Sequence, residues 1–216
     1  MLVALADRLA IVDLTNGDLE PLAELPHRRN GMRANDGAVD PGGRFWIGTM
    51  CDDEAPDLAA LYRYDGDGSL TTVLEDISLS NGLAWSGDER RMYYVDSPTL
   101  RIDVLDYDTA TGAVENRRPF ATIEAGVGVP DGVVLDDDGG VWVALYGGAQ
   151  VRRYDPDGAL DAVLAVPADN VTACWFGGED GRRLFITTAR SPQPLGGCLF
   201  VAEPGFTGRP AQEFAG

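Results

Sequence analysis

The feature that most constrains the fold is an internal repeat with a period of 43 to 49 residues. Each copy places a polar or Gly-rich turn before a short strand that contains an aromatic residue. The aromatic positions Trp46, Tyr93, Trp142 and Phe185 follow one another at steps of 47, 49 and 43 residues. A repeat of this length is typical of chains that copy one supersecondary unit several times. The chain is therefore expected to consist of successive similar units.

The repeats have the composition of β-structure. Each contains short runs rich in Val, Ile, Leu and aromatic residues, and a second strand signal ends in Tyr-Asp at 61–65, 104–108 and 151–155. This pattern predicts an all-β fold, a β-propeller of four-stranded blades. At a period near 46, the 216 residues accommodate between four and five blades. A β-sandwich is the rival fold, but it does not explain why the aromatic and Asp-Gly signals keep phase.

The charge of the chain limits its partners. There are 35 acidic and 17 basic residues, the formal net charge is -18, and every basic residue is Arg. Such a surface repels phosphate backbones and anionic lipid headgroups, which disfavours nucleic-acid and membrane partners. Three cysteines far apart in the chain indicate reduced thiols. No signal peptide or membrane-spanning stretch is recognisable, so the expected location is the cytoplasm.

Three Asx-Gly pairs recur in phase with the repeat, at Asp36, Asn81 and Asp131, with steps of 45 and 50 residues. If each stands just ahead of the innermost strand of a blade, their side-chain oxygens converge at one mouth of the propeller channel. Converging carboxylate and amide oxygens suit a hard cation such as Ca²⁺ or Mg²⁺, and Mn²⁺ or Zn²⁺ can also be accepted. The alternative is that the pairs are hairpin turns. For Asp36 the two interpretations have equal weight.

Arg33 is a further candidate, and two roles stay open for it. It can neutralise neighbouring carboxylates, or it can hold substrate hydroxyls or a carbonyl through its planar fork of donors. The single histidine, His27, lies in a polar stretch, and neither a G-x-S-x-G motif nor a phosphate-binding loop is present. A Ser-His-Asp mechanism is therefore disfavoured. A hydrolase built from these residues would use a metal and a carboxylate.

Several motifs taken together resemble the gluconolactonase/regucalcin family, also known as the senescence marker protein family. They occur in the same order as in that family, at 33–50, 80–86, 92–97, 130–132, 142–144 and 174–178. The resemblance covers nearly the whole chain. It implies a six-bladed propeller with one divalent cation, Ca²⁺ in the first place, with Zn²⁺, Mn²⁺ and Mg²⁺ as alternatives. Residues 1–216 would form a single propeller domain.

The resemblance also implies a role for each candidate residue. Asn81 and Asp131 would be metal ligands, and Asp131 would also be the catalytic base. Arg33, Asn35 and Asp36 would bind the substrate. The implied activity is hydrolysis of a sugar lactone in carbohydrate metabolism, in which the cation polarises the lactone carbonyl, water attacks, and the ring opens to an aldonic acid.

The chain departs from the family pattern in two places. Family members begin with about a blade and a half before the position of Met1, and that part carries a Glu metal ligand, so the propeller is expected to be incomplete at its N-terminus. The segment 51–60 is also shorter than a family loop that often carries a substrate-contacting acidic residue. Two other functions stay open: hydrolysis of a phosphotriester at the same site, and a non-catalytic or calcium-binding propeller remnant.

Overall fold

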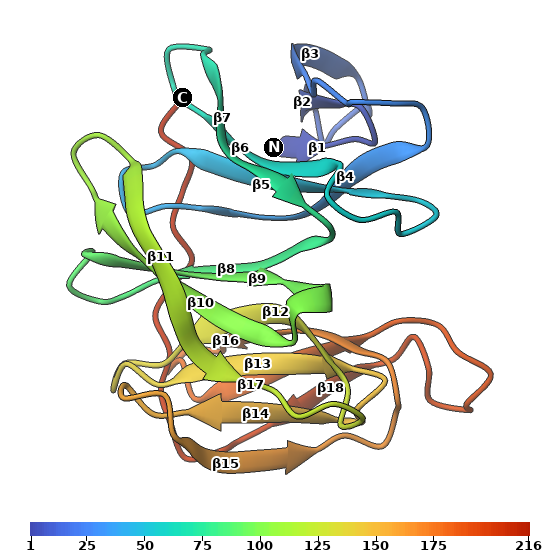
Figure 1. Cartoon of the computed structure of the whole chain (residues 1–216), viewed down its shortest axis with the longest axis vertical. Coiled ribbons are helices and arrows are strands. Elements are labelled where there is room, and N and C mark those ends of the chain that lie inside the picture. The colour runs from blue at the N-terminus through green and yellow to red at the C-terminus, as the bar shows by residue number, and fades with distance from the viewer. The chain divides into compact units, whose positions relative to one another are not determined.

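The regular secondary structure of the protein is almost entirely β-strand. A computed structural model describes residues 1–216, and its strands form five antiparallel sheets that follow one another along the chain (Figure 1). Three sheets have four strands and two have three, and within each sheet the strands are neighbours in sequence order. Three sheets thus have the four strands predicted for a propeller blade, whereas the first and the last have three, and the sheets are numbered blades 1 to 5 in chain order.

The chain divides into two compact units, Met1–Ser80 with Gln212–Gly216, and Asn81–Ala211. The single domain predicted for residues 1–216 stays a prediction. Blades 1 and 2 belong to the first unit and contain β1 (Leu2–Ala4), β2 (Arg8–Val12) and β3 (Leu19–Glu24), then β4 (Met32–Val39), β5 (Phe45–Cys51), β6 (Ala59–Tyr64) and β7 (Leu70–Ile77).

Blades 3 to 5 belong to the second unit, except that β8 begins one residue earlier. Blade 3 contains β8 (Ser80–Trp85), β9 (Arg91–Asp96), the 3-10 helix η1 (Ser97–Thr99), β10 (Arg101–Asp108) and β11 (Ala113–Thr122). Blade 4 contains β12 (Val129–Leu135), β13 (Val141–Tyr146), β14 (Gln150–Tyr154) and β15 (Leu160–Ala165). Blade 5 contains β16 (Val171–Gly177), β17 (Arg183–Thr188) and β18 (Leu199–Ala202).

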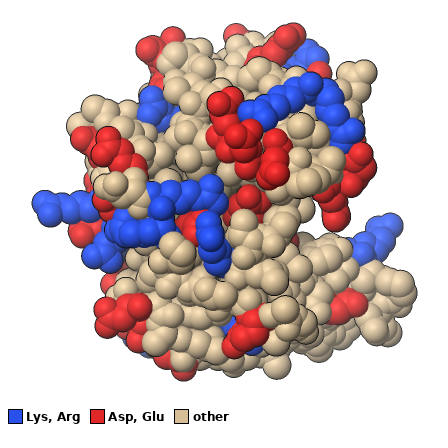
Figure 2. All heavy atoms as spheres, viewed as in Figure 1, with Lys and Arg blue, Asp and Glu red and all other residues tan.

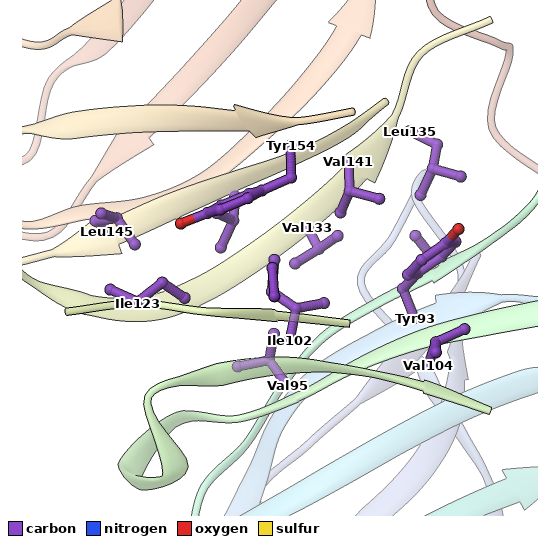
Figure 3. Close-up of a cluster of buried hydrophobic side chains, with 13 residues drawn as sticks. Tyr93, Val95, Ile102, Val104, Ile123, Val133, Leu135, Val141, Leu145 and Tyr154 are labelled. Carbon is purple, nitrogen blue, oxygen red and sulfur yellow. The ribbon is translucent and has the colours of Figure 1, made fainter. Parts of the chain in front are cut away.

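Blades 3, 4 and 5 pack face to face, which explains why β13 is apolar at successive positions. Val141, Val143 and Leu145 lie in a core cluster with residues of blade 3. Trp142 and Ala144 lie in a second cluster with residues of blade 5. Figure 3 shows the first cluster, in which side chains of blades 3 and 4 point toward each other. Because successive side chains of a strand point to opposite faces, a strand covered on both faces needs an uninterrupted apolar run.

The first unit has a core of its own between blades 1 and 2. Leu9 and Leu25 from the part of the chain around blade 1 pack with Ile47 of β5. The C-terminal segment contributes to the same core through Phe214, whose ring stacks on Tyr64 with the ring centroids 5.8 Å apart. Complete burial of side chains of this size stabilises the fold by about 1.5–3 kcal/mol each.

The two most similar copies of the repeat each contain a buried carboxylate that accepts a hydrogen bond from the Trp of the repeat. Asp40 Oδ2 accepts a hydrogen bond from Trp46 Nε1 at 2.8 Å, and Asp136 Oδ2 accepts one from Trp142 Nε1 at 2.7 Å. In both blades the Asp precedes the Trp by six residues, across the turn between the first and second strands. The fixed spacing of the sequence signal therefore reflects a hydrogen bond that ties this turn to the buried second strand.

Arg153 completes this arrangement in blade 4. Its Nε donates to Asp136 Oδ2 at 2.6 Å, and its Nη1 pairs with Asp161. The guanidinium carbon lies 4.0 Å from the ring centroid of Phe206. Only 5% of the Arg153 side chain and none of the Asp136 side chain is exposed. A buried, charge-assisted pair of this kind is strongly destabilising to break, since removal of one partner leaves a charge without compensation.

Blade 5 has one buried face and one exposed face. Cys174 and Leu184 are buried, whereas Trp175 is 42% and Val201 is 52% exposed. Phe185 pairs with both Trp175 and Val201 across the sheet, so the three side chains share the exposed face. The middle strand of this blade therefore alternates between buried and exposed positions, unlike β13 of blade 4.

Arginine and carboxylate side chains lie beside one another over the face visible in Figure 2. Arg28 pairs with Asp76 at 2.9 Å, and Arg118 pairs with Asp106 at 2.8 Å. Exposed pairs of this kind contribute about 0–1 kcal/mol each. The one helix, η1, has three residues, and no helix of the structure is long and apolar enough to cross a membrane.

Replacement of the buried guanidinium tests the role of this pair. Arg153→Leu is expected to lower the free energy of unfolding by about 3 kcal/mol, because Asp136 then stays buried without its cation. Arg118→Leu is the matched control, since it removes an exposed pair with Asp106 and should change stability by less than about 1 kcal/mol. Urea unfolding followed by circular dichroism gives both values. Equal losses in the two variants would contradict a structural role for the buried pair.

Candidate functional site

The three Asx-Gly pairs lie inside the first strands of their blades. Asp36 is in β4, Asn81 is the second residue of β8, and Asp131 is the third residue of β12. The prediction that they stand just ahead of these strands is therefore wrong by a few residues, and the hairpin-turn interpretation is wrong for all three. Strand pairing is irregular at two of the pairs, between residues 34 and 37 and between residues 130 and 133. Such bulges let a side chain leave the regular alternation of a strand.

The glycines of the second unit make room for the next blade. A Cβ at Gly82 would lie 2.6 Å from the carbonyl oxygen of Asp131, and a Cβ at Gly132 would lie 2.9 Å from Cα of Ala173. No side chain fits in either place, because the first strands of blades 3, 4 and 5 approach so closely. Asn81 and Asp131 are thus carried on adjacent blades at the points of closest approach.

Two hydrogen bonds connect the region of Asn81 with that of Asp131. Asn81 is 7% exposed, and its Nδ2 donates to Ser97 Oγ at 2.7 Å. Ser97 Oγ in turn donates to the carbonyl oxygen of Pro130 at 2.6 Å. Ser97 was not among the residues predicted from the sequence. In the sequence it is the last residue of the motif at 92–97, directly after a predicted strand and at a Ser-Pro step that starts η1.

The charge of Asp131 also acts on a residue of blade 5, Cys174. Burial, together with the negative charge of Asp131, raises the pKa of the Cys174 thiol to about 12. This thiol is protonated at neutral pH and is therefore no nucleophile. Cys51, Cys174 and Cys198 are all free thiols, and the first two are buried.

The other predicted residues, Arg33 and Asn35, lie together on β4 of the first unit. Arg33 Nη1 donates to Asn35 Oδ1 at 2.9 Å, and Arg33 Nε lies 3.6 Å from Asp52 Oδ1. Asn35 Nδ2 donates to the carbonyl oxygen of Ser80 at 2.9 Å. The Arg33 side chain is nonetheless 44% exposed, so an ion pair with Asp52 and contact with a ligand are compatible.

The pKa of Asp36 is clearly perturbed. Its Oδ1 accepts a hydrogen bond from the backbone N–H of Gly37 at 2.8 Å, which favours the ionised form. Burial has the larger and opposite effect and raises the pKa of Asp36 to about 6. Desolvation disfavours the charged form of a carboxyl group. Asp36 can therefore gain or lose a proton close to neutral pH.

The donors of the second unit suit a hard cation. Because the amide nitrogen of Asn81 faces Ser97, its oxygen is turned to the other side of the amide group. Asn81 and Asp131 would supply amide and carboxylate oxygens, which Ca²⁺ and Mg²⁺ prefer. No group of three or more His, Cys, Asp or Glu side chains is arranged to hold a metal ion. The types of donor atom at Asn81 and Asp131 therefore suit a hard cation, and they do not suit a thiolate or polyhistidine site.

The raised pKa of Asp36 predicts a pH-dependent stability. Since its folded-state pKa of about 6 lies above the ordinary 3.8, the carboxyl group favours the folded state below pH 4 and this contribution is lost as the pH rises through 6. In chelator-treated buffer, Asp36→Asn should raise the free energy of unfolding by about 2 kcal/mol at pH 8 and leave it nearly unchanged at pH 4.

The control for Asp36→Asn is Asp67→Asn, on an exposed turn where the hydrogen bond from Ser69 lowers the pKa of the carboxylate. This change should not raise stability at either pH. Urea unfolding at the two pH values is the measurement. A gain of the same size at pH 4 and pH 8 for Asp36→Asn would show that titration of Asp36 is not its cause.

Comparison with known proteins identifies the family. A sequence model described as the SMP-30/Gluconolactonase/LRE-like region matches residues 1–190. Regucalcin of Danio rerio is 39% identical over 226 residues, which cover 99% of this chain and 76% of the relative. The solved structure of regucalcin from Agrobacterium tumefaciens, described as a calcium-binding protein, superposes with a TM-score of 0.93 at 32% identity and covers 99% of this chain and 75% of that one.

A gluconolactonase from Xanthomonas campestris superposes with a TM-score of 0.68 at 28% identity, over 90% of this chain and 64% of that one. The structural matches confirm the predicted β-propeller fold. The family match and the regucalcin relative confirm the predicted family. The chain therefore belongs to the SMP-30/gluconolactonase/LRE-like family.

Proposed function

We propose that the protein hydrolyses a sugar lactone, with a divalent cation held by Asn81 and Asp131. The observation that supports this most is the hydrogen-bonded connection from Asn81 through Ser97 to Pro130, the neighbour of Asp131. It joins two oxygen donors of adjacent blades that the sequence had singled out by phase. Similarity to a gluconolactonase supports the substrate class.

The chemistry assigned to the chain's own residues is proton transfer and substrate binding. When bound, a divalent cation supplies Lewis-acid polarisation of the lactone carbonyl. Asp131 takes a proton from the attacking water, whose oxygen forms a bond to the carbonyl carbon. The bond from that carbon to the ring oxygen then breaks, and Asp131 returns its proton to the ring oxygen. One water is consumed, and the product is a hydroxy acid that ionises at neutral pH.

Arg33, Asn35 and Asp36 are the residues proposed to bind the sugar. The half-exposed guanidinium of Arg33 can donate to hydroxyl or carbonyl oxygens of a ligand, and Asn35 orients it through the hydrogen bond between them. Asp36 can donate to or accept from a sugar hydroxyl, since a pKa of about 6 makes both protonation states accessible near neutral pH.

Cation binding without catalysis is the second candidate function. The observation that favours it is the likeness to a regucalcin structure described as calcium-binding, at 32% identity over 99% of this chain. The two functions differ in one result. A protein that binds Ca²⁺ tightly but does not accelerate the hydrolysis of aldonolactones would be a cation-binding propeller.

Loss of the proposed base should abolish turnover. Asp131→Asn keeps the shape of the side chain but removes its charge and basicity, so kcat is expected to fall by about 10² or more. Acid release from glucono-lactone, followed with a pH indicator in the presence of Ca²⁺, Mg²⁺, Mn²⁺ or Zn²⁺, is the measurement. Asp137→Asn is the control, because Asp137 is 46% exposed and pairs with Arg209. Unchanged turnover in Asp131→Asn would exclude the proposed mechanism.

Loss of the proposed substrate-binding cation should act mainly on KM. Arg33→Ala is expected to raise KM about tenfold while kcat changes by less than about threefold. The reason is that the charge-assisted hydrogen bonds of Arg33 would stabilise the bound substrate and the transition state equally. Arg8→Ala removes an exposed arginine paired with Asp7 on the same unit and serves as the control. A large fall in kcat with constant KM would place Arg33 in the chemical step instead.

A further inference from the structure

Ser97 stands out because its hydroxyl makes two hydrogen bonds inside the protein, although it belongs to none of the repeat signals. It is 2% exposed and lies between the first strands of blades 3 and 4 through its contacts with Asn81 and Pro130. We propose that Ser97 is a positioning residue that fixes the orientation of the Asn81 amide for the cation proposed above. This role rests on the function proposed above.

The directions of the two hydrogen bonds determine the orientation of the amide. The carbonyl oxygen of Pro130 can only accept, so the Ser97 hydroxyl hydrogen points to it, at an O···O distance of 2.6 Å. The hydroxyl oxygen is then an acceptor toward Asn81, at 2.7 Å. Only the NH₂ side of a carboxamide can donate, so the nitrogen of Asn81 must face Ser97. The amide oxygen consequently lies on the side of the amide that faces away from Ser97.

A short rigid turn holds Ser97 in this place. Ser97 opens η1, and Pro98 at the start of the helix restricts the backbone. Leu100 ends the turn in the left-handed region with φ at 52°, and its N–H donates to the Ser97 carbonyl oxygen at 3.1 Å. Thr99 Oγ1 closes the same turn by donating to the carbonyl oxygen of Asp96 at 2.6 Å. The Ser97 hydroxyl is therefore presented by a backbone with little freedom.

The same hydroxyl contacts one proposed cation ligand and the residue that precedes the other. It contacts Asn81 directly, and it contacts the carbonyl group of Pro130, which belongs to the peptide unit that leads into Asp131. Removal of the hydroxyl would remove one hydrogen bond that orients the Asn81 amide and one that anchors the β12 backbone. Groups that orient metal ligands in this way typically change metal affinity by about 10- to 100-fold when they are replaced.

The test is calcium titration of the full chain by isothermal titration calorimetry. Ser97→Ala is expected to raise the dissociation constant for Ca²⁺ about tenfold. Thr99→Ala is the matched control, because it removes a hydroxyl of the same turn that bonds only to Asp96, and it should change the constant by less than twofold. Ser97→Thr keeps the hydroxyl and should restore most of the affinity.

A double-mutant cycle separates positioning from a general effect on the fold. In an Asn81→Ala background, Ser97→Ala should weaken Ca²⁺ binding no further, because the group through which Ser97 acts is gone. An independent measurement uses the unmodified protein: the side-chain NH₂ of Asn81 should exchange its hydrogens slowly in NMR spectra, since it is buried and donates to Ser97. This result does not depend on whether Ser97→Ala folds.

The outcomes distinguish this proposal from the function on which it rests. Ca²⁺ binding by Ser97→Ala at wild-type affinity, an equal loss in the Asn81→Ala background, or rapid exchange of the Asn81 side chain would each overturn the role of Ser97 while the proposed lactonase stands. A wild-type protein that neither binds Ca²⁺ nor hydrolyses lactones would overturn the proposed function, and the role of Ser97 with it.

Discussion

The close approach of the first strands of blades 3, 4 and 5 is the constraint on which the second unit depends. At Gly82 and Gly132 the neighbouring backbone lies so near that a single added carbon would overlap it. The glycines therefore allow the apolar faces of the blades to meet, and they also bring the residues before them close to the next blade. Asn81 and Asp131 owe their placement to the absence of a neighbouring side chain as much as to their own polarity.

The fold was largely predictable from the sequence, since its repeat signal has a local physical cause. The hydrogen bond from Trp142 to Asp136 joins residues six positions apart, and Trp46 and Asp40 repeat that spacing. Strands that are covered on both faces can likewise be recognised in the sequence as continuous apolar runs. The same period predicts that Asn81 and Asp131 occupy equivalent positions in neighbouring blades.

Other parts of the site could not be read from spacing. Ser97 acts from the end of a different strand, and only the folded chain brings it to Asn81 and Pro130. The ion pair between Arg33 and Asp52 joins a strand to a loop of no recognisable pattern. The irregular pairing around Asp36 also has no signal in the sequence. A bulge changes how a strand pairs with its neighbour, but it does not change the amino-acid composition of the bulged strand.

Blade 5 gains hydrophobic stabilisation from one face only, because Trp175, Phe185 and Val201 line a side of the sheet on which two of the three are substantially exposed. Its outermost strand, β18, also has no further strand beside it. Local opening of β18 thus sacrifices fewer apolar contacts than opening of β13, which is covered on both sides. Amide hydrogens of this last strand should accordingly exchange with solvent well before those of the middle blades, and a protease should find its first entry here.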